Sequence, residues 1–179
     1  MSSIHSRSQK TVFLLVGAKG SGKTYIGCLL EKALGICFIR VEQRLMEFLE
    51  SRPSHSRDLA NDGYDLELEW IDEALSEHHE VICEATGSSR FLSQYLNDIR
   101  KKYDLKLIRV VCPLDICFAR VKRRSKKHQF TVTDEKVQEI NAASHNVKLS
   151  WDLEIDNSGN ASDIQIVHSF HSLRAERHA

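Results

Sequence analysis

The sequence predicts an α/β fold, a three-layer α/β/α arrangement in which helices cover both faces of a five-stranded parallel sheet. Two observations lead to this prediction. Five extended apolar stretches recur along the 179 residues, each followed by a segment of helical period, with no linker or repeat between them. In addition, the glycine-rich stretch GAKGSGKT joins the first apolar stretch directly to the first helical segment, as expected for a parallel strand followed by its helix.

Strands and helices are expected to alternate along the whole chain. TVFLLV (11–16) has the β-branched and aromatic content of a buried parallel strand, and SGKTYIGCLLEKAL has apolar residues at helical spacing. Pro113 indicates the start of a helix in LDICFARVKRR, and QFTVTDEKVQEINAASHNVKL resumes a helix. The segment 51–64 is rich in turn formers and charges, and we expect a mobile loop at the mouth of a substrate site. The other strands are expected at 36–41, 80–85, 105–112 and 151–156.

The bulk composition excludes several classes of protein. Hydrophobic residues make up 41% of the chain, which is too many for wholesale disorder. Lysine plus arginine and aspartate plus glutamate number 25 each, so no global field favours nucleic acid or a membrane. No apolar run is long enough to span a bilayer, and the first ten residues lack the apolar core of a signal peptide. The five cysteines have no paired spacing, so we expect reduced core thiols in a cytoplasmic protein.

GAKGSGKT has the spacing of a phosphate-binding loop, or P-loop. Glycine at three of its eight positions lets the backbone curl with its N–H groups pointing into one concavity, which is an anion cradle. Lys23 would reach the β- and γ-phosphates of a nucleotide, and the Thr24 hydroxyl would take one place on Mg²⁺. A chance glycine turn is the alternative, but the flanking strand and helix favour the motif. The candidate nucleotide-binding residues are Gly17, Ala18, Lys19, Gly20, Ser21, Gly22, Lys23 and Thr24.

Polar residues after the other strands are the next candidates, because ligands of open parallel sheets collect at the carboxyl ends of the strands. Glu84 follows the buried stretch VIC, where an acid would hold Mg²⁺ directly or through water, or orient the attacking hydroxyl. The alternative for Glu84 is a solvated carboxylate. Glu42 follows the second strand as an acceptor-binding group or general base, and a surface role is equally open. In TGSS, Ser88 would cap the next helix, and the turn would bind an anion or the substrate.

The densest positive charge lies in RVKRRSKKH, residues 120–128. Its place between two helical segments favours a lid whose arginines close on the transferring phosphoryl group. Arg120, Arg123 and Arg124 have the spacing of one helix face and suit bidentate phosphate contacts. Arg120 and Arg124 are the catalytic candidates, and we expect them to have few partners until the anion arrives. A nucleic-acid patch and a solvated surface are the alternatives.

Taken together, the stretches GAKGSGKT, ICEATGSS, VVCPLDICFARVKRR and LEIDNSG resemble those of P-loop kinases of the nucleotide-kinase and shikimate-kinase type. The resemblance implies a P-loop NTPase fold with strand order 2-3-1-4-5, an ATP donor with Mg²⁺, a lid at about 120–132 and an acceptor-binding insertion at about 42–79. The loop after the last strand contacts adenine in such kinases, which indicates Asn157, Ser158 and Gly159. The single domain is expected over 11–170, between flexible ends at 1–10 and 171–179.

Two departures from the family leave the phosphoryl acceptor open. Shikimate kinases have a paired-aspartate motif after the second strand and a glycine triplet after the third, where this chain has VEQ and TGSS. The predicted function is therefore an ATP-dependent kinase for a small-molecule hydroxyl or phosphate acceptor, monomeric or homodimeric, with no membrane partner. The alternatives are a catalytically silent ATP-binding module or ATPase subunit, and a polynucleotide kinase. The absence of an Asn-Lys-x-Asp run after the fourth strand argues against a regulatory GTPase, and the histidines lack the spacing of a zinc site.

Overall fold

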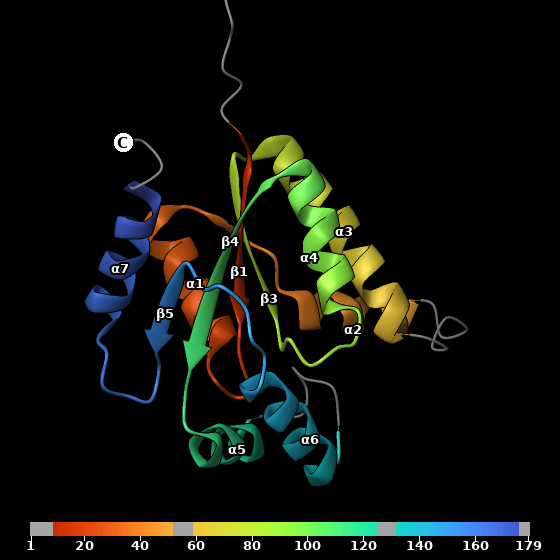
Figure 1. Ribbon diagram of the computed structural model, residues 1–179, viewed down its shortest axis with the longest axis vertical. Helices are drawn as coiled ribbons and strands as arrows, with labels where there is room; N and C mark the ends of the chain where they lie inside the picture. Colours follow the sequence, from red (N-terminus) through yellow and green to blue (C-terminus); the bar gives the residue numbers. More distant parts are fainter. Residues whose placement is uncertain (1–8, 52–58, 125–131, 176–179) are drawn as a thin grey trace, which may run out of the picture.

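Five parallel strands form one sheet in the order β2-β3-β1-β4-β5 in the computed structural model (Figure 1). The order confirms the expected P-loop arrangement. The structure describes residues 9–51, 59–124 and 132–175, with only the backbone of 59–62. The strands are β1 (Thr11–Val16), β2 (Cys37–Phe38), β3 (Glu80–Ala85), β4 (Asp104–Val111) and β5 (Leu153–Asp156). The helices are α1 (Lys23–Leu34), α2 (Val41–Ser51), α3 (Leu59–Glu77), α4 (Leu92–Lys102), α5 (Leu114–Arg123), α6 (Asp134–His145) and α7 (Asp163–Ala175).

The central strand β1 brings the functional stretches together. All of its residues are buried, and it pairs with β3 on one side and β4 on the other, so that Leu15 lies opposite both Glu84 and Ile108. Because the strands are parallel, their carboxyl ends lie at the same edge of the sheet. Helices α5 and α6 lie at this edge, at the bottom of Figure 1. The edge therefore carries the P-loop, Glu84 and the segment that follows β4.

Helices cover the two faces of the sheet as the apolar pattern predicts (Figure 1). One face of β1, with Val12 and Leu14, packs in a cluster with residues of α3 and α4. The other face, with Phe13 and Leu15, packs in a second cluster with residues of α1 and α7. Alternate residues of one strand thus supply both cores, which explains why TVFLLV is apolar throughout.

The second strand is shorter than predicted. The sequence predicts extended structure over 36–41, but only Cys37–Phe38 are assigned to β2, and Val41 already begins α2. One more ladder bond follows, because the N–H of Ile39 donates to the carbonyl oxygen of Ile82 (2.8 Å). After that the N–H of Arg44 donates to the carbonyl oxygen of Arg40 (3.0 Å), so the helical pattern takes over. β2 is an edge strand with one neighbour, and it ends where α2 starts to pack.

The loop predicted for 51–64 is also shorter. Ser51 ends α2, and α3 begins at Leu59, so Leu59–Tyr64 are helical, while 52–58 lie outside the described residues. Tyr64 stacks on Tyr95 of α4, with ring centroids 4.4 Å apart. This tertiary contact favours a longer helix than the local composition predicts.

The structure describes part of each chain end that the sequence predicts to be flexible. At the C-terminus, 171–175 belong to α7 and are helical rather than frayed, because Phe170 and Leu173 are buried against the sheet. At the N-terminus, the carbonyl oxygen of Lys10 accepts from the N–H of Asp104 (3.0 Å). Residues 1–8 and 176–179 lie outside the described part. Within the described part, no helix combines the length and apolar character needed to cross a membrane.

Candidate functional site

The P-loop requires glycine at two positions. Gly20 and Gly22 have φ values of +90° and +94°, in the left-handed region that favours glycine. A Cβ atom at Gly20 would lie 2.2 Å from the carbonyl oxygen of Cys117 in α5. A Cβ atom at Gly22 would lie 2.0 Å from Nδ2 of Asn157, in the loop after β5. The loop is thus shaped both by its own backbone and by two distant segments that press against it.

Helix α1 begins at the P-loop without a side-chain cap. Gly22 is its N-cap residue, and glycine has no side chain that could accept a hydrogen bond from the first turn. An N-terminus in this state offers backbone N–H groups and the positive end of the helix dipole to an anion. The geometry therefore suits a phosphate group.

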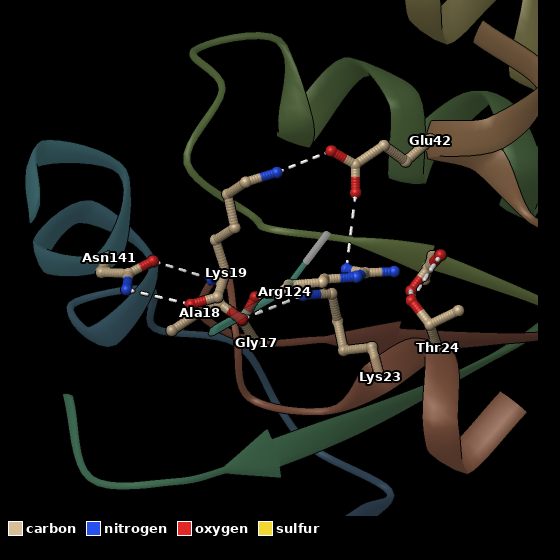
Figure 2. Close-up of polar contacts among 9 residues, drawn as sticks. Gly17, Ala18, Lys19, Lys23, Thr24, Glu42, Arg124 and Asn141 are labelled. Carbon is tan, nitrogen blue, oxygen red and sulfur yellow. Dashed lines mark hydrogen bonds and ion pairs between the residues drawn. The ribbon is translucent and has the colours of Figure 1, made fainter. Parts of the chain in front are cut away.

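Lys23 folds back on the loop to which it belongs (Figure 2). Its Nζ donates to the carbonyl oxygens of Gly17 (2.9 Å) and Ala18 (3.0 Å), and only 8% of the residue is exposed. Burial lowers the pKa of Lys23, while the nearby Glu84 carboxylate opposes the shift. The ammonium group is therefore poorly hydrated. In this position it would attract a phosphate group more strongly than an exposed lysine would.

Thr24 and Glu84 face each other across the P-loop. The Thr24 hydroxyl lies 2.9 Å from one carboxylate oxygen of Glu84 and 3.2 Å from the other. Burial raises the pKa of Glu84, and Lys23 together with the Thr24 hydrogen bond opposes the shift. A hydroxyl and a carboxylate are the hard oxygen ligands that Mg²⁺ prefers, so this pair fits the ion. Within 9–51, 59–124 and 132–175 no group of three or more His, Cys, Asp or Glu could hold a metal, so further ligands would come from phosphate or water.

Glu42 joins three elements at the mouth of the P-loop. It lies in the first turn of α2, and one carboxylate oxygen is 2.6 Å from Nζ of Lys19. Its other oxygen is 3.9 Å from Nη1 of Arg124, just after α5. Figure 2 shows both cations pointing at Glu42 from different segments. The side chains are 24% exposed for Glu42, 13% for Lys19 and 40% for Arg124, so this charge cluster is partly shielded from water.

Arg120 also has partners, contrary to the expectation of few contacts before an anion binds. Its Nη1 donates to the carbonyl oxygen of Asn157 (2.9 Å) and contacts the Cys112 sulfur (3.4 Å). Asn157 in turn donates from Nδ2 to the carbonyl oxygen of Ser21 (2.7 Å). Arg120 therefore ties α5 to the loop after β5, and that loop supports the P-loop. Most of the predicted lid, 125–131, lies outside the described residues.

The remaining residues of the predicted adenine loop are Ser158 and Gly159. The N–H of Ser158 donates to Oδ1 of Asp156 (2.8 Å), and Gly159 has a φ of +114° with open space around it.

The TGSS turn differs from the prediction. Ser88 does not cap α4, because the helix begins at Leu92 with Phe91 in the cap position. The Ser88 hydroxyl instead hydrogen-bonds that of Thr86 (2.8 Å).

Sequence reasoning missed Asn141, which holds the P-loop from α6. Its Oδ1 accepts from the backbone N–H of Lys19 (2.7 Å), and its Nδ2 donates to the backbone carbonyl of the same residue (3.1 Å; Figure 2). Only 3% of Asn141 is exposed. The sequence signal for Asn141 is a polar residue on the buried side of a helix. No motif in this segment indicates which residue it would bind.

Sequence reasoning also missed Glu67, a buried acid on α3. It is 2% exposed, and its Oε1 has no hydrogen-bond partner among the described residues. The Tyr95 hydroxyl hydrogen-bonds the carboxyl group, and the same hydroxyl lies 4.0 Å from the Cys83 sulfur. Burial raises the pKa of Glu67 to about 8, with Tyr95 opposing the shift and the Glu84 charge adding to it. Glu67 is therefore mostly neutral at pH 7.

The comparisons with known proteins agree with the fold. The profile of the AAA domain family matches residues 12–145, while curated proteins give no match. The structure is similar to a sugar kinase from Janibacter sp. HTCC2649 (TM-score 0.64, 13% identity, 93% of this chain and 95% of that chain). It is also similar to the APS kinase of Mycobacterium tuberculosis (0.62, 13%, 93% and 98%) and a shikimate kinase from Bacteroides thetaiotaomicron (0.55, 14%, 96% and 99%). At these identities the likeness establishes the fold alone. The family match covers well over half of the chain, so the protein belongs to the AAA domain family and has the fold of the P-loop kinases.

Proposed function

We propose that the protein is a kinase that transfers the γ-phosphoryl group of ATP to a hydroxyl or phosphate group of a small molecule. The observation that carries the proposal is the Thr24 hydroxyl on the Glu84 carboxylate, 2.9 Å away, directly beside the buried Lys23. A phosphate-binding loop alone would suit any nucleotide-binding protein. Phosphoryl transfer also needs a group that holds the metal ion and orients the attacking hydroxyl. The Glu84 carboxylate near the end of β3 suits both tasks.

Each residue of the site has a proposed role. The N–H groups at the start of α1 and the ammonium of Lys23 would bind the phosphates, with Asn157, Ser158 and Gly159 near the base. Thr24 and Glu84 would hold Mg²⁺, which neutralises phosphate charge when bound. Arg120 and Arg124 would stabilise the charge that develops on the transferring group.

Glu42 would act between the phosphates and the acceptor. It belongs to the proposed acceptor-binding insertion at 42–79, and its carboxylate touches Lys19 of the P-loop (2.6 Å). It would bind the acceptor or take a proton from it once Lys19 turns to phosphate. The domain at 11–170, the lid at 120–132, a monomer or homodimer, and a cytoplasmic location that fits five free cysteines complete the proposal.

A catalytically silent ATP-binding module is the second candidate, and one observation favours it. In the structure the Glu42 carboxylate is already paired with Lys19 and, at 3.9 Å, with Arg124, so it is engaged with these cations rather than with an acceptor. An active kinase must exchange these ion pairs during its cycle.

A transfer assay with ATP labelled in the γ-phosphate, run over pools of sugars, small acids and nucleotides, tests the proposal. Glu84→Gln should lower turnover with every acceptor by about 10- to 100-fold and change the dependence on Mg²⁺. Glu42→Gln should mainly raise KM for the acceptor. ATP binding without transfer to any pool would support the silent module. The same kinetic change in both variants would show that the two carboxylates do not have separate roles.

A further inference from the structure

A cavity of about 200 Å³ lies beside the start of the P-loop, and Lys23 and Thr24 do not line it. Val16, Gly17 and Ala18 form its P-loop wall, and the end of β4 and the end of α6 form the others. A wider hollow lined by the segment 145–149 shares Arg109, His145 and Trp151 with the cavity, so the two form one recess that opens outward. Two of the proposed nucleotide-binding residues, Gly17 and Ala18, line the cavity. The other proposed nucleotide and metal ligands do not.

The recess exposes apolar side chains that a folded protein usually covers. Val111 and Leu114 are 36% and 37% exposed, and among the described residues they belong to a group of four exposed large apolar side chains, with Tyr25 and Ile164. Both line the cavity together with Pro113. Two exposed aliphatic side chains in one concave site indicate that an apolar ligand group covers them.

A buried hydroxyl lines the same cavity. Ser144, near the end of α6, is 7% exposed, and its Oγ has no hydrogen-bond partner among the described residues. A buried polar atom without a partner is costly, and an acceptor atom of a ligand would remove this cost. The site therefore combines an apolar wall with one hydrogen-bond donor.

The rim of the recess is cationic. Arg109 lies with its guanidinium carbon 5.8 Å from the centre of the Trp151 ring, and Lys148 and His145 add N–H donors. The described residues that line the two hollows include no aspartate or glutamate. The nearest competing acid is Glu154, whose carboxylate is 3.5 Å from Arg109 and 54% exposed. An exposed pair of this length is weak, so an anionic ligand group can replace it.

We propose that this recess is a second binding site, for a small carboxylate with one aromatic ring. A cavity of roughly 150 Å³ accommodates benzene, so a volume of about 200 Å³ suits a single ring. The ring would pack on Val111, Leu114 and Trp151, and the carboxylate would bind Arg109 and the hydroxyl of Ser144. Since the ligand would also touch Gly17 and Ala18, whose carbonyls hold Lys23, its binding should change the affinity for ATP. The site stands on its own contacts and does not depend on kinase activity.

The chain contains two tryptophans, so Trp70→Phe leaves Trp151 as the reporter. In this background 4-fluorophenylacetate is titrated by Trp151 fluorescence and ¹⁹F NMR, with 4-fluorophenylacetamide as the uncharged isostere. We expect saturable binding of the acid with a Kd of about 1 mM or tighter, and weaker binding of the amide. Arg109→Gln should weaken the acid about tenfold without affecting the amide, and Ser144→Ala should weaken the acid about three- to tenfold. Glu154→Gln, which removes the competing acid, should bind at least as tightly as the parent.

Leu114→Glu places a negative charge at an exposed position of the wall and should abolish binding, whereas Ile164→Ser, at an exposed apolar residue elsewhere, should leave it unchanged. Thermal unfolding verifies that both variants are folded. The proposal is overturned if the acid shows no saturable binding, if Leu114→Glu binds like the parent, or if acid and amide bind equally in all variants. A Ser144→Ala variant that is more stable and binds equally well would remove the hydroxyl from the site and with it the proposed orientation.

Discussion

Lys23 shows how burial prepares a residue for a ligand at a cost to the free protein. Its amine is desolvated, and its hydrogen bonds go to the carbonyl oxygens of Gly17 and Ala18. Because its pKa is lowered on folding, the unfolded chain binds more protons between the lowered value and 10.5. The stability of the nucleotide-free protein should therefore rise with pH in that window, as far as this lysine contributes.

Lys23→Met separates binding from stability. We expect the variant to lose about 1.5–3 kcal/mol of nucleotide binding free energy, because hydrogen bonds to a charged group are removed. We also expect its stability to rise less with pH than that of the parent, between about pH 7 and pH 10. Calorimetry with Mg-ATP and denaturant titrations at both pH values measure the two effects. Lys101→Met, at an exposed lysine of α4, serves as the control. Unchanged ATP binding in Lys23→Met would contradict the assignment of the P-loop.

Glu67 gives the opposite pH dependence. Its pKa rises from the ordinary glutamate value of 4.5 to about 8 in the folded chain, because burial disfavours the charged form. The folded state then binds more protons than the unfolded state between these values, so its contribution to stability is complete below about pH 4.5 and is lost as the pH rises towards about 8.

Glu67→Gln should remove this loss and stabilise the protein at pH 8 by on the order of 2 kcal/mol, with little change near pH 5. Urea titrations at the two pH values test the expectation. The matched control is Glu69→Gln, at an exposed glutamate of the same helix. An equal effect of both substitutions at pH 8 would show that Glu67 is not the buried acid responsible.

At the scale of elements, the P-loop is held by segments from three parts of the chain. Cys117 of α5 fills the space beside Gly20, Asn157 after β5 supports Ser21, and Asn141 of α6 binds Lys19. Helices α5 and α6 flank the proposed lid, so movement of either helix would change its contacts with the P-loop. This arrangement provides a physical route by which lid position and nucleotide binding would influence each other.

Asn141→Ala tests the connection between α6 and the P-loop. Removing the amide leaves the backbone N–H and carbonyl of Lys19 without their partner, which should cost about 1–3 kcal/mol of stability. Asn141→Asp should not rescue the variant, since a carboxylate cannot donate to the Lys19 carbonyl. Both variants should also weaken Mg-ATP binding. Gln138→Ala, at an exposed residue of α6, should change neither quantity. Equal stability in Asn141→Ala and Gln138→Ala would mean that the amide does not support the loop.

At the scale of the whole molecule, the sheet couples the site to the stability of the fold. β1 carries the P-loop at its end and supplies both apolar clusters, and Phe13 on β1 contacts Phe170 on α7, with ring centroids 4.7 Å apart. A ligand that binds only the folded P-loop must therefore stabilise the complete domain.

Mg-ATP at about 100 times its Kd should stabilise the protein by about 2.7 kcal/mol. For a chain of this length the melting temperature should then rise by roughly 5–10 °C. Thermal scans with and without Mg-ATP measure the shift, and Lys23→Met should abolish most of it. A shift of the same size in the variant would mean that ATP stabilises the protein at another place.

The sequence by itself determined the order of strands and helices, the P-loop and the place of Glu84, because these depend on local apolar period and on residues close together in the chain. The strand order 2-3-1-4-5 came from the family resemblance and is confirmed. Only the tertiary structure decided that β2 stops at Phe38 and that Arg120 is already paired with Asn157. It also brought Asn141 to Lys19, 122 residues away, and put Tyr95 next to the neutral acid Glu67. Hydrogen bonds and burial of this kind join distant segments, and they leave no periodic or local pattern from which they could be predicted.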